Sequence, residues 1–166
     1  MEFKEMFSKL TNDDSFKSWN ALHKTCFLAH AFVMKDDKNV ELWQFGYYNP
    51  ASKKMTTFLS EDGKIRILAE QDVLESGNKI ETVNPKDVVI SVVQMKESAE
   101  KVLKEMYNNQ PLSKSFFIIQ NIEGKGPLYN LTYFTMTFKT INIKINSLTG
   151  DVVEHTIMGL ADFDKK

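Results

Sequence analysis

The sequence contains the same pattern of aromatic, polar and turn residues twice. Residues 42–48 (Leu-Trp-Gln-Phe-Gly-Tyr-Tyr) align with residues 128–134 (Leu-Tyr-Asn-Leu-Thr-Tyr-Phe), at an offset of 128 − 42 = 86. The turn glycines Gly63 and Gly150 follow at 150 − 63 = 87, so one residue of slippage joins the two matches. Because each copy of an internal repeat is normally one folding unit, this feature predicts a fold built from two similar halves.

Composition places the chain among ordinary globular proteins. Its 166 residues suffice to bury a core, and 42% hydrophobic and 26% charged residues are close to the globular average. A formal net charge of −1 argues against a nucleic-acid partner, since phosphate binding normally requires a basic surface. The apolar runs are a few residues long, whereas a membrane span takes about 20, so no membrane partner is expected.

The cysteine count and the N-terminus both bear on the cellular compartment. A single cysteine, Cys26, excludes an intrachain disulfide. The first residues, 1–5, mix charged and apolar side chains and lack the apolar run of a secretory signal. Together these features predict a reduced, cytoplasmic protein.

Three segments have helical periodicity. The apolar residues of segment 3–10 recur every three or four positions, which predicts an N-terminal helix. Ser15 is the predicted N-cap of a second helix, and Ser91 that of a third, where Gln94 completes a capping box. The third helix carries an apolar stripe made of Val92, Met95, Ala99, Val102, Leu103 and Met106.

Alternating and β-rich runs predict eight strands, joined by short turns. Asp62-Gly63 is typical of a hairpin turn because it readily supplies positive φ, and Gly124-Lys125-Gly126 precedes a strand and also indicates a hairpin. The predicted strands are 26–34, 40–48, 55–60, 64–69, 115–122, 128–137, 140–146 and 152–158.

Each half therefore has the order helix, then four strands. We predict an α+β protein of two helix-plus-four-stranded antiparallel repeats with an extra N-terminal helix, the two sheets lying side by side or fused into one longer sheet. The predicted divisions are residues 1–74 for the N-terminal helix and first repeat, 75–90 for a linker rich in turn residues, and 91–166 for the second repeat.

The second half resembles the end of a PepSY domain. In residues 140–153 an alternating strand runs into the polar turn Ser147–Gly150 and then into a Val-Val strand, and the preceding strand 128–133 is similar to the family's next strand upstream. The resemblance covers about residues 90–158 and extends less closely to 15–70. It implies a cystatin-like, helix-wrapped sheet without catalytic residues. Family members typically work outside the cytoplasm in inhibition or chaperoning, whereas we expect a cytoplasmic protein without an attached peptidase, so the resemblance implies the fold rather than inhibition.

The residues that could carry chemistry do not form a catalytic or metal-binding pattern. His23, Cys26 and His30 would share one face of a continuous helix, but the helix is expected to end before Cys26. A Cys26–His155 nucleophile pair has no feature that brings the two residues together. The glycines around Lys125 precede a strand and lack the rest of a phosphate-loop motif. We therefore expect no catalytic residues, no cofactor and no metal, and thus no enzyme.

The aromatic strands are the feature with functional promise. One face of each is expected to form core against a helix, yet the opposite face also becomes apolar. The candidate interaction surface comprises Tyr48, Phe134, Met136 and Phe138. We expect something to cover these side chains: the N-terminal helix, the other repeat, a second subunit or a partner.

Two functions follow from these aromatic strands. The first is a non-catalytic module that binds an unidentified protein or peptide partner, with a homodimer left open. The alternative is a carrier of a small apolar ligand, with a pocket between helix and sheet lined by Trp19, Trp43, Tyr47 and Met106.

Overall fold

The structure, a computed structural model, describes residues 1–35, 38–74 and 77–159. Its helices are α1 (Phe3–Asn12), α2 (Asp14–Leu22) and α3 (Val92–Met106), with a single 3-10 turn, η1 (Pro85–Asp87), in the described residues. Nine strands are found within those residues: β1 (Phe27–Lys35), β2 (Glu41–Asn49), β3 (Lys54–Glu61), β4 (Lys64–Ile67), β5 (Gln71–Asp72), β6 (Leu112–Ile122), β7 (Gly126–Thr135), β8 (Lys139–Asn146) and β9 (Val152–Gly159).

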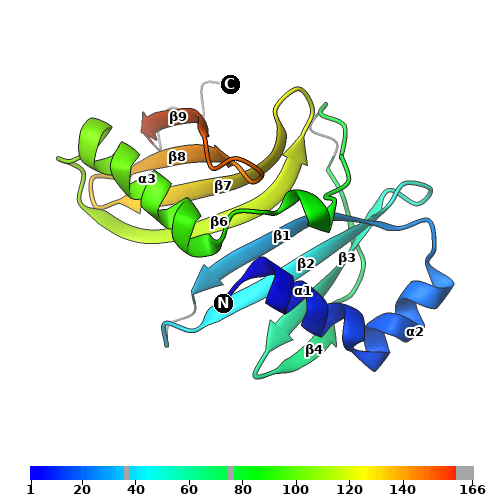
Figure 1. Ribbon diagram of the computed structural model, residues 1–166. Helices are drawn as coiled ribbons and strands as arrows, with labels where there is room; N and C mark the ends of the chain where they lie inside the picture. The colour runs from blue at the N-terminus through cyan, green and yellow to red at the C-terminus, as the bar shows by residue number, and fades with distance from the viewer. Residues whose placement is uncertain (36–37, 75–76, 160–166) are drawn as a thin grey trace.

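The predicted fold class, two helix-plus-four-stranded antiparallel repeats with an extra N-terminal helix, is wrong. The strands lie in one antiparallel sheet of order β4-β3-β2-β1-β6-β7-β8-β9, with β5 paired to β3 (Figure 1). The central strands β1 and β6 pair with each other, Ala31 opposite Ile119, so hydrogen bonds join the two halves. Alternation along a strand cannot reveal this arrangement, because it reports which faces are buried and not which strand lies alongside.

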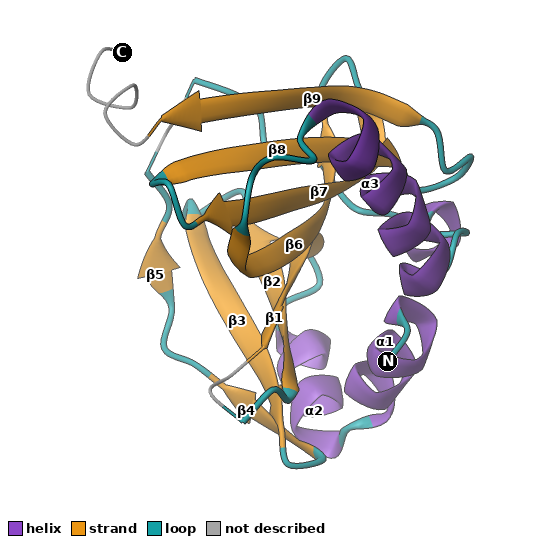
Figure 2. Ribbon diagram, turned by 90° about the vertical axis from the view of Figure 1, so that its left-hand side faces the viewer, coloured by secondary structure: helices purple, strands orange, loops and turns teal. Residues whose placement is uncertain are grey.

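All three helices lie on the same side of the sheet (Figure 2). Helices α1 and α2 cover the half with β1 to β4, and α3 covers the half with β6 to β9 (Figure 1). The core lies between helices and sheet. This confirms that both aromatic strands turn one face to the helices, with Trp43, Phe45 and Tyr47 from the first copy and Tyr129, Leu131 and Tyr133 from the second.

The helix starts follow from capping. The N-cap of α2 is Asp13, two residues before the predicted Ser15, because the Asp13 carboxylate accepts from the backbone N–H groups of Ser15 and Phe16. A hydrogen bond from the Ser15 hydroxyl is the main cause that lowers the pKa of Asp13, so this cap is charged at neutral pH. The capping box predicted for Ser91 and Gln94 is confirmed at the start of α3.

The hairpin turns follow the residues that favour them. Asp62 and Gly63 both have positive φ, at 50° and 74°, as the β3–β4 turn requires. The predicted hairpin around Lys125 is confirmed as the β6–β7 turn. Strand β7 ends at Thr135, two residues before the predicted end of its strand, and β5 was not predicted.

The segment that connects the two halves packs against the sheet. Of the predicted linker 75–90, residues 75 and 76 lie outside the described part. Val83 and Val88 are buried, and the Val83 N–H donates to the Leu28 carbonyl at 2.7 Å. The Ser147 hydroxyl donates to the Asp87 carbonyl at 2.8 Å, which ties the segment to the β8–β9 turn. Within the described ranges, no helix has the length and apolar character needed to cross a membrane.

Candidate functional site

The sheet face turned away from the helices, called here the open face, carries a line of three phenylalanine rings. Phe32 of β1, Phe116 of β6 and Phe134 of β7 alternate with helix-facing core residues of their strands. Ring centroids are 5.3 Å apart between Phe32 and Phe116 and 6.0 Å apart between Phe116 and Phe134. This phenylalanine row therefore runs across three neighbouring strands, and Phe134 at its end is 37% exposed.

Apolar residues extend the phenylalanine row on the open face. Met34 of β1 lies directly opposite Phe116 in the β1–β6 register and opposite Leu42 in the β1–β2 register. Ile118 lies opposite Phe32 in the same way. Cross-strand neighbours on one face have Cβ atoms about 5 Å apart, so these side chains form one contiguous apolar patch.

The β7–β8 turn presents two further apolar side chains to solvent. Met136 is 66% exposed and Phe138 is 77% exposed. The predicted interaction surface placed both on one strand face with Phe134, but they belong to the turn because β7 ends at Thr135. Phe138 has a φ of 58°, a left-handed conformation that costs a non-glycine residue about 1–2 kcal/mol.

Hydrogen bonds hold this turn in place. The Thr135 hydroxyl accepts from the Lys139 N–H at 3.0 Å, and the Thr137 hydroxyl donates to the Gln110 side chain at 3.1 Å. The Met136 N–H donates to the Pro111 carbonyl at 2.8 Å. Two exposed apolar side chains therefore stand on a well-anchored backbone.

A polar network bounds the apolar patch on its β8–β9 side. Glu154 of β9 forms ion pairs with Lys125 and Lys144. The hydrogen bond that Glu154 accepts from Lys125 is the largest cause that lowers its pKa, and the one from Lys144 is the next. Asn142 of β8 donates to the Asn130 side chain at 2.6 Å and to the Leu131 carbonyl at 3.0 Å. The open face is thus apolar at its centre and polar toward this edge.

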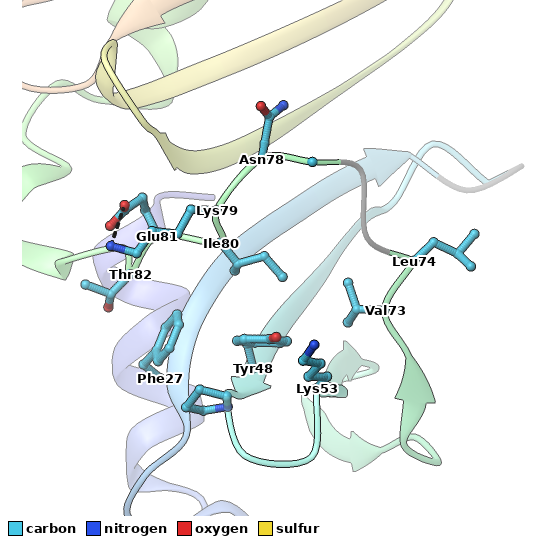
Figure 3. A pocket seen from close by; sticks show the side chains of 12 residues that line it. Phe27, Tyr48, Lys53, Val73, Leu74, Asn78, Lys79, Ile80, Glu81 and Thr82 are labelled. Carbon is cyan, nitrogen blue, oxygen red and sulfur yellow. Dashed lines mark ion pairs between the residues drawn. The ribbon is translucent and has the colours of Figure 1, made fainter.

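Tyr48, the remaining residue of the predicted interaction surface, lies in a pocket of about 820 Å³ over β1 and β2 (Figure 3). Its ring makes an edge contact with Phe27, with centroids 5.6 Å apart. Ile80 and Val73 point toward the hollow, whereas Leu74 points away (Figure 3). Lys79 and Glu81 pair at 3.2 Å beside it, so the pocket has aromatic and aliphatic walls and a charged rim.

His30 lies in a second hollow of about 550 Å³, beside Gln120 of β6. Its ring lies directly over Gly46, where an added Cβ would come within 2.6 Å of His30 Nε2. Glycine at position 46 is what lets the ring lie against the sheet. Burial lowers the pKa of His30, which favours the neutral imidazole.

We expect this burial to make the protein sensitive to mild acid. The unfolded chain protonates His30 near pH 6.5, while the folded chain resists protonation until a lower pH. The free energy of unfolding should therefore fall as pH drops from about 6.5 toward the folded-state pKa. Urea unfolding at pH 7.5, 6.5 and 5.5 measures this, and a His30→Gln variant should lose less stability over the range. Equal losses in both proteins would contradict the assignment.

The four residues of the predicted helix–sheet pocket do not line one cavity: Trp19 and Tyr47 are in contact, but Trp43 and Met106 lie elsewhere. Trp19 contacts Tyr47 and Phe58, with ring centroids 5.6 and 4.9 Å apart. Trp43 is fully buried between Phe45 and Phe117 and has no described hydrogen-bond partner for its indole N–H. Met106 is exposed at the end of α3 and lines a different groove, beside β9.

The histidines and the cysteine are likewise dispersed. His23 stacks on Trp19, and its Nδ1 lies 2.7 Å from the Trp19 carbonyl oxygen. Burial raises the pKa of the Cys26 thiol, and nearby Glu70 raises it further. His155 is on β9, and its Nδ1 lies 2.8 Å from the Tyr107 hydroxyl. Among the described residues, no three His, Cys, Asp or Glu side chains are grouped to hold a metal ion.

Sequence reasoning missed most of the phenylalanine row. Phe134 was predicted to lie on the open face, but Phe32 and Phe116 were not selected. Each alternates with buried neighbours in its own strand, a signal that was present, but their meeting depends on the β1–β6 register.

Comparison with known proteins identifies a fold neighbour and no family. No family model matches the sequence, and no curated protein matches it. A crystal structure at 1.85 Å of a "putative lipoprotein" from Clostridium difficile 630 superposes with a TM-score of 0.57 at 15% identity. The match covers 87% of this chain and 91% of that one. At this identity the similarity establishes a shared fold alone.

Proposed function

We propose that this chain is a non-catalytic module that binds a protein or peptide partner through its open face. The observation that carries the proposal is the phenylalanine row, Phe32–Phe116–Phe134, on the side of the sheet opposite the helices. Contiguous exposed apolar patches on soluble domains usually mark contact sites, and aromatic anchors contribute much of the binding energy at such sites.

The surroundings of the row suit a protein partner. Met34, cross-strand from Phe116, and Met136, in the turn after Phe134, offer flexible, adaptable contact surface. The network around Glu154 provides a polar rim, which is the usual anatomy of a protein interface. Phe138, exposed in the β7–β8 turn close to Phe134 along the chain, adds a further aromatic side chain.

Several features support a role without catalysis. Cys26 has a raised pKa, which disfavours the nucleophilic thiolate. His155 Nδ1 is engaged by the Tyr107 hydroxyl at 2.8 Å rather than by Cys26. The PepSY likeness and the cytoplasmic location stay predictions, and fractionation of the source cells tests the second.

The experiment is capture from a lysate of the source organism with three baits. Wild type and a Leu22→Asp control, altered at an exposed position on α2, should retain the same protein, and a Phe134→Asp, Phe138→Asp variant should lose it. With the purified partner, calorimetry should show binding weakened by about 30-fold or more, as for a hot spot of about 2 kcal/mol. A partner bound equally by all three baits would contradict the proposal.

The second candidate, carriage of a small apolar ligand, is favoured by the pocket over Tyr48 and Phe27. Its volume of about 820 Å³ lies within the range of ligand sites. It is on the open face and not between helix and sheet. Native mass spectrometry of protein purified from its source would detect a retained small molecule, which would favour this candidate.

A further inference from the structure

The two edges of the sheet differ in how well they are protected. Strand β4 is short, at four residues, and carries the charges of Lys64 and Arg66, the latter paired with Glu61 at 3.4 Å. Strand β9 has eight residues and ends the strand order, with β8 as its neighbour among the described residues. Short length and charged side chains are the usual means by which proteins protect an edge from pairing.

Strand β9 has few of these protections. Between Val152 and Met158 it contains no lysine, arginine or proline, and its one carboxylate, Glu154, is engaged by two lysines of its own chain. Val153 and Ile157 are 44% and 37% exposed. A register shift between Lys144 and Ile145 of β8 leaves Val153 as a bulge near the start of β9, and residues 154–159 pair regularly with β8.

The sequence of β9 is self-complementary about His155. When two copies of β9 pair antiparallel with His155 opposite His155, residues lie opposite each other if their numbers sum to 155 + 155 = 310. Val153 then faces Ile157, and Glu154 faces Thr156. Val152 faces Met158 in the same register, so apolar residues oppose apolar residues and no two carboxylates meet.

The groove beside β9 offers complementary cover for such a pair. It has a volume of about 600 Å³ and lies between α3 and the start of β9. Val102 and Met106 give it an apolar wall, and Lys101 and Glu105 give it both signs of charge. A two-fold axis brings the groove of each copy beside the junction, with both signs of charge at its wall.

We propose that β9 pairs antiparallel with β9 of a second copy of this chain, about a two-fold axis at His155. The two sheets then become one continuous sheet, with main-chain hydrogen bonds across the axis. The open face stays accessible in this dimer. The inference therefore goes beyond the proposed function and is independent of it.

Light scattering after size exclusion, over a concentration series, tests the dimer with a matched pair of edge variants. Wild type should have twice the 19.1 kDa chain mass. Ile157→Lys should shift it to the single-chain mass, whereas Ile67→Lys, at a 40%-exposed position on the opposite edge, should remain a dimer. Circular dichroism confirms that both variants are folded. A monomeric wild type, or a dimer unaffected by Ile157→Lys, would overturn the proposal.

Cross-linking tests the register. In a Cys26→Ser background, a short bis-maleimide should join two copies through His155→Cys, because residues on the axis lie opposite each other, and should not join them through Ile67→Cys. A dimer that links only through position 67 would refute the assignment. Phe134→Asp should leave the mass unchanged, which separates failure of the dimer from failure of the open-face proposal.

Discussion

Replacing Phe117 with aspartate is expected to unfold the protein at 25 °C. Phe117 lies on the helix side of β6, 6% exposed, in edge contact with Trp43 and Tyr129 at centroid distances of 6.0 and 5.9 Å. A carboxylate there would be buried among apolar rings at a cost of several kcal/mol, added to the loss of the phenyl packing. Together these costs approach the whole stability of a typical domain, about 5–15 kcal/mol.

Far-ultraviolet circular dichroism and urea titration check this prediction. The Phe117→Asp variant should give the spectrum of an unfolded chain, or unfold at a urea concentration far below that of wild type. A cooperative transition with a midpoint close to the wild-type value would show that position 117 does not face the core.

Replacing Trp43 with alanine should lower the free energy of unfolding by about 3–5 kcal/mol, the cost of deleting a large buried aromatic side chain. Trp43 is fully buried on β2 between Phe45 and Phe117. Trp43→Phe should cost only about 1 kcal/mol, because the smaller ring loses packing but leaves no unpaired polar group. It also removes the indole N–H, which has no described partner, and burying such a group costs about 1–3 kcal/mol.

Urea unfolding of both variants at pH 7.5 measures the two values, with an unchanged dependence on urea concentration as the sign that only stability has altered. If Trp43→Phe proved as costly as Trp43→Ala, packing of the indole would outweigh the unpaired N–H, and the second part of the prediction would fail.

Local structure was largely predictable because it depends on neighbours in the sequence. The capping box of Ser91 and the Asp62-Gly63 turn are set within three or four residues, and both were predicted. The start of α2 was missed because two potential caps compete there, and the Asp13 carboxylate accepts from two backbone N–H groups where Ser15 was predicted to act.

Long-range structure was not predictable from the same information. The pairing of Ala31 with Ile119 joins residues far apart in sequence, and no local pattern distinguishes it from two separate sheets. The repeat correctly placed aromatic residues on the core face, yet it suggested two units where one sheet exists.

The candidate site divides in the same way. Phe134 could be assigned to the open face from alternation with Tyr133 alone. Its neighbour Phe116 depends on the β6–β7 register, and the pocket over Tyr48 depends on a connecting segment that returns across the sheet, with Ile80 beside it. Met136 and Phe138 were assigned to the face of Phe134 because the alternating pattern continues past Thr135, where β7 ends, into the turn.

The account rests on a sheet that is covered by helices on one side and open on the other. The free energies of unfolding of Phe134→Asp and Phe117→Asp, measured side by side by urea titration with light scattering, test this most directly. We expect Phe134→Asp to stay folded, within about 1 kcal/mol of wild type as for an exposed position, while Phe117→Asp unfolds. If Phe134→Asp unfolded as Phe117→Asp does, the open face would be internal, and the proposed binding surface would not exist.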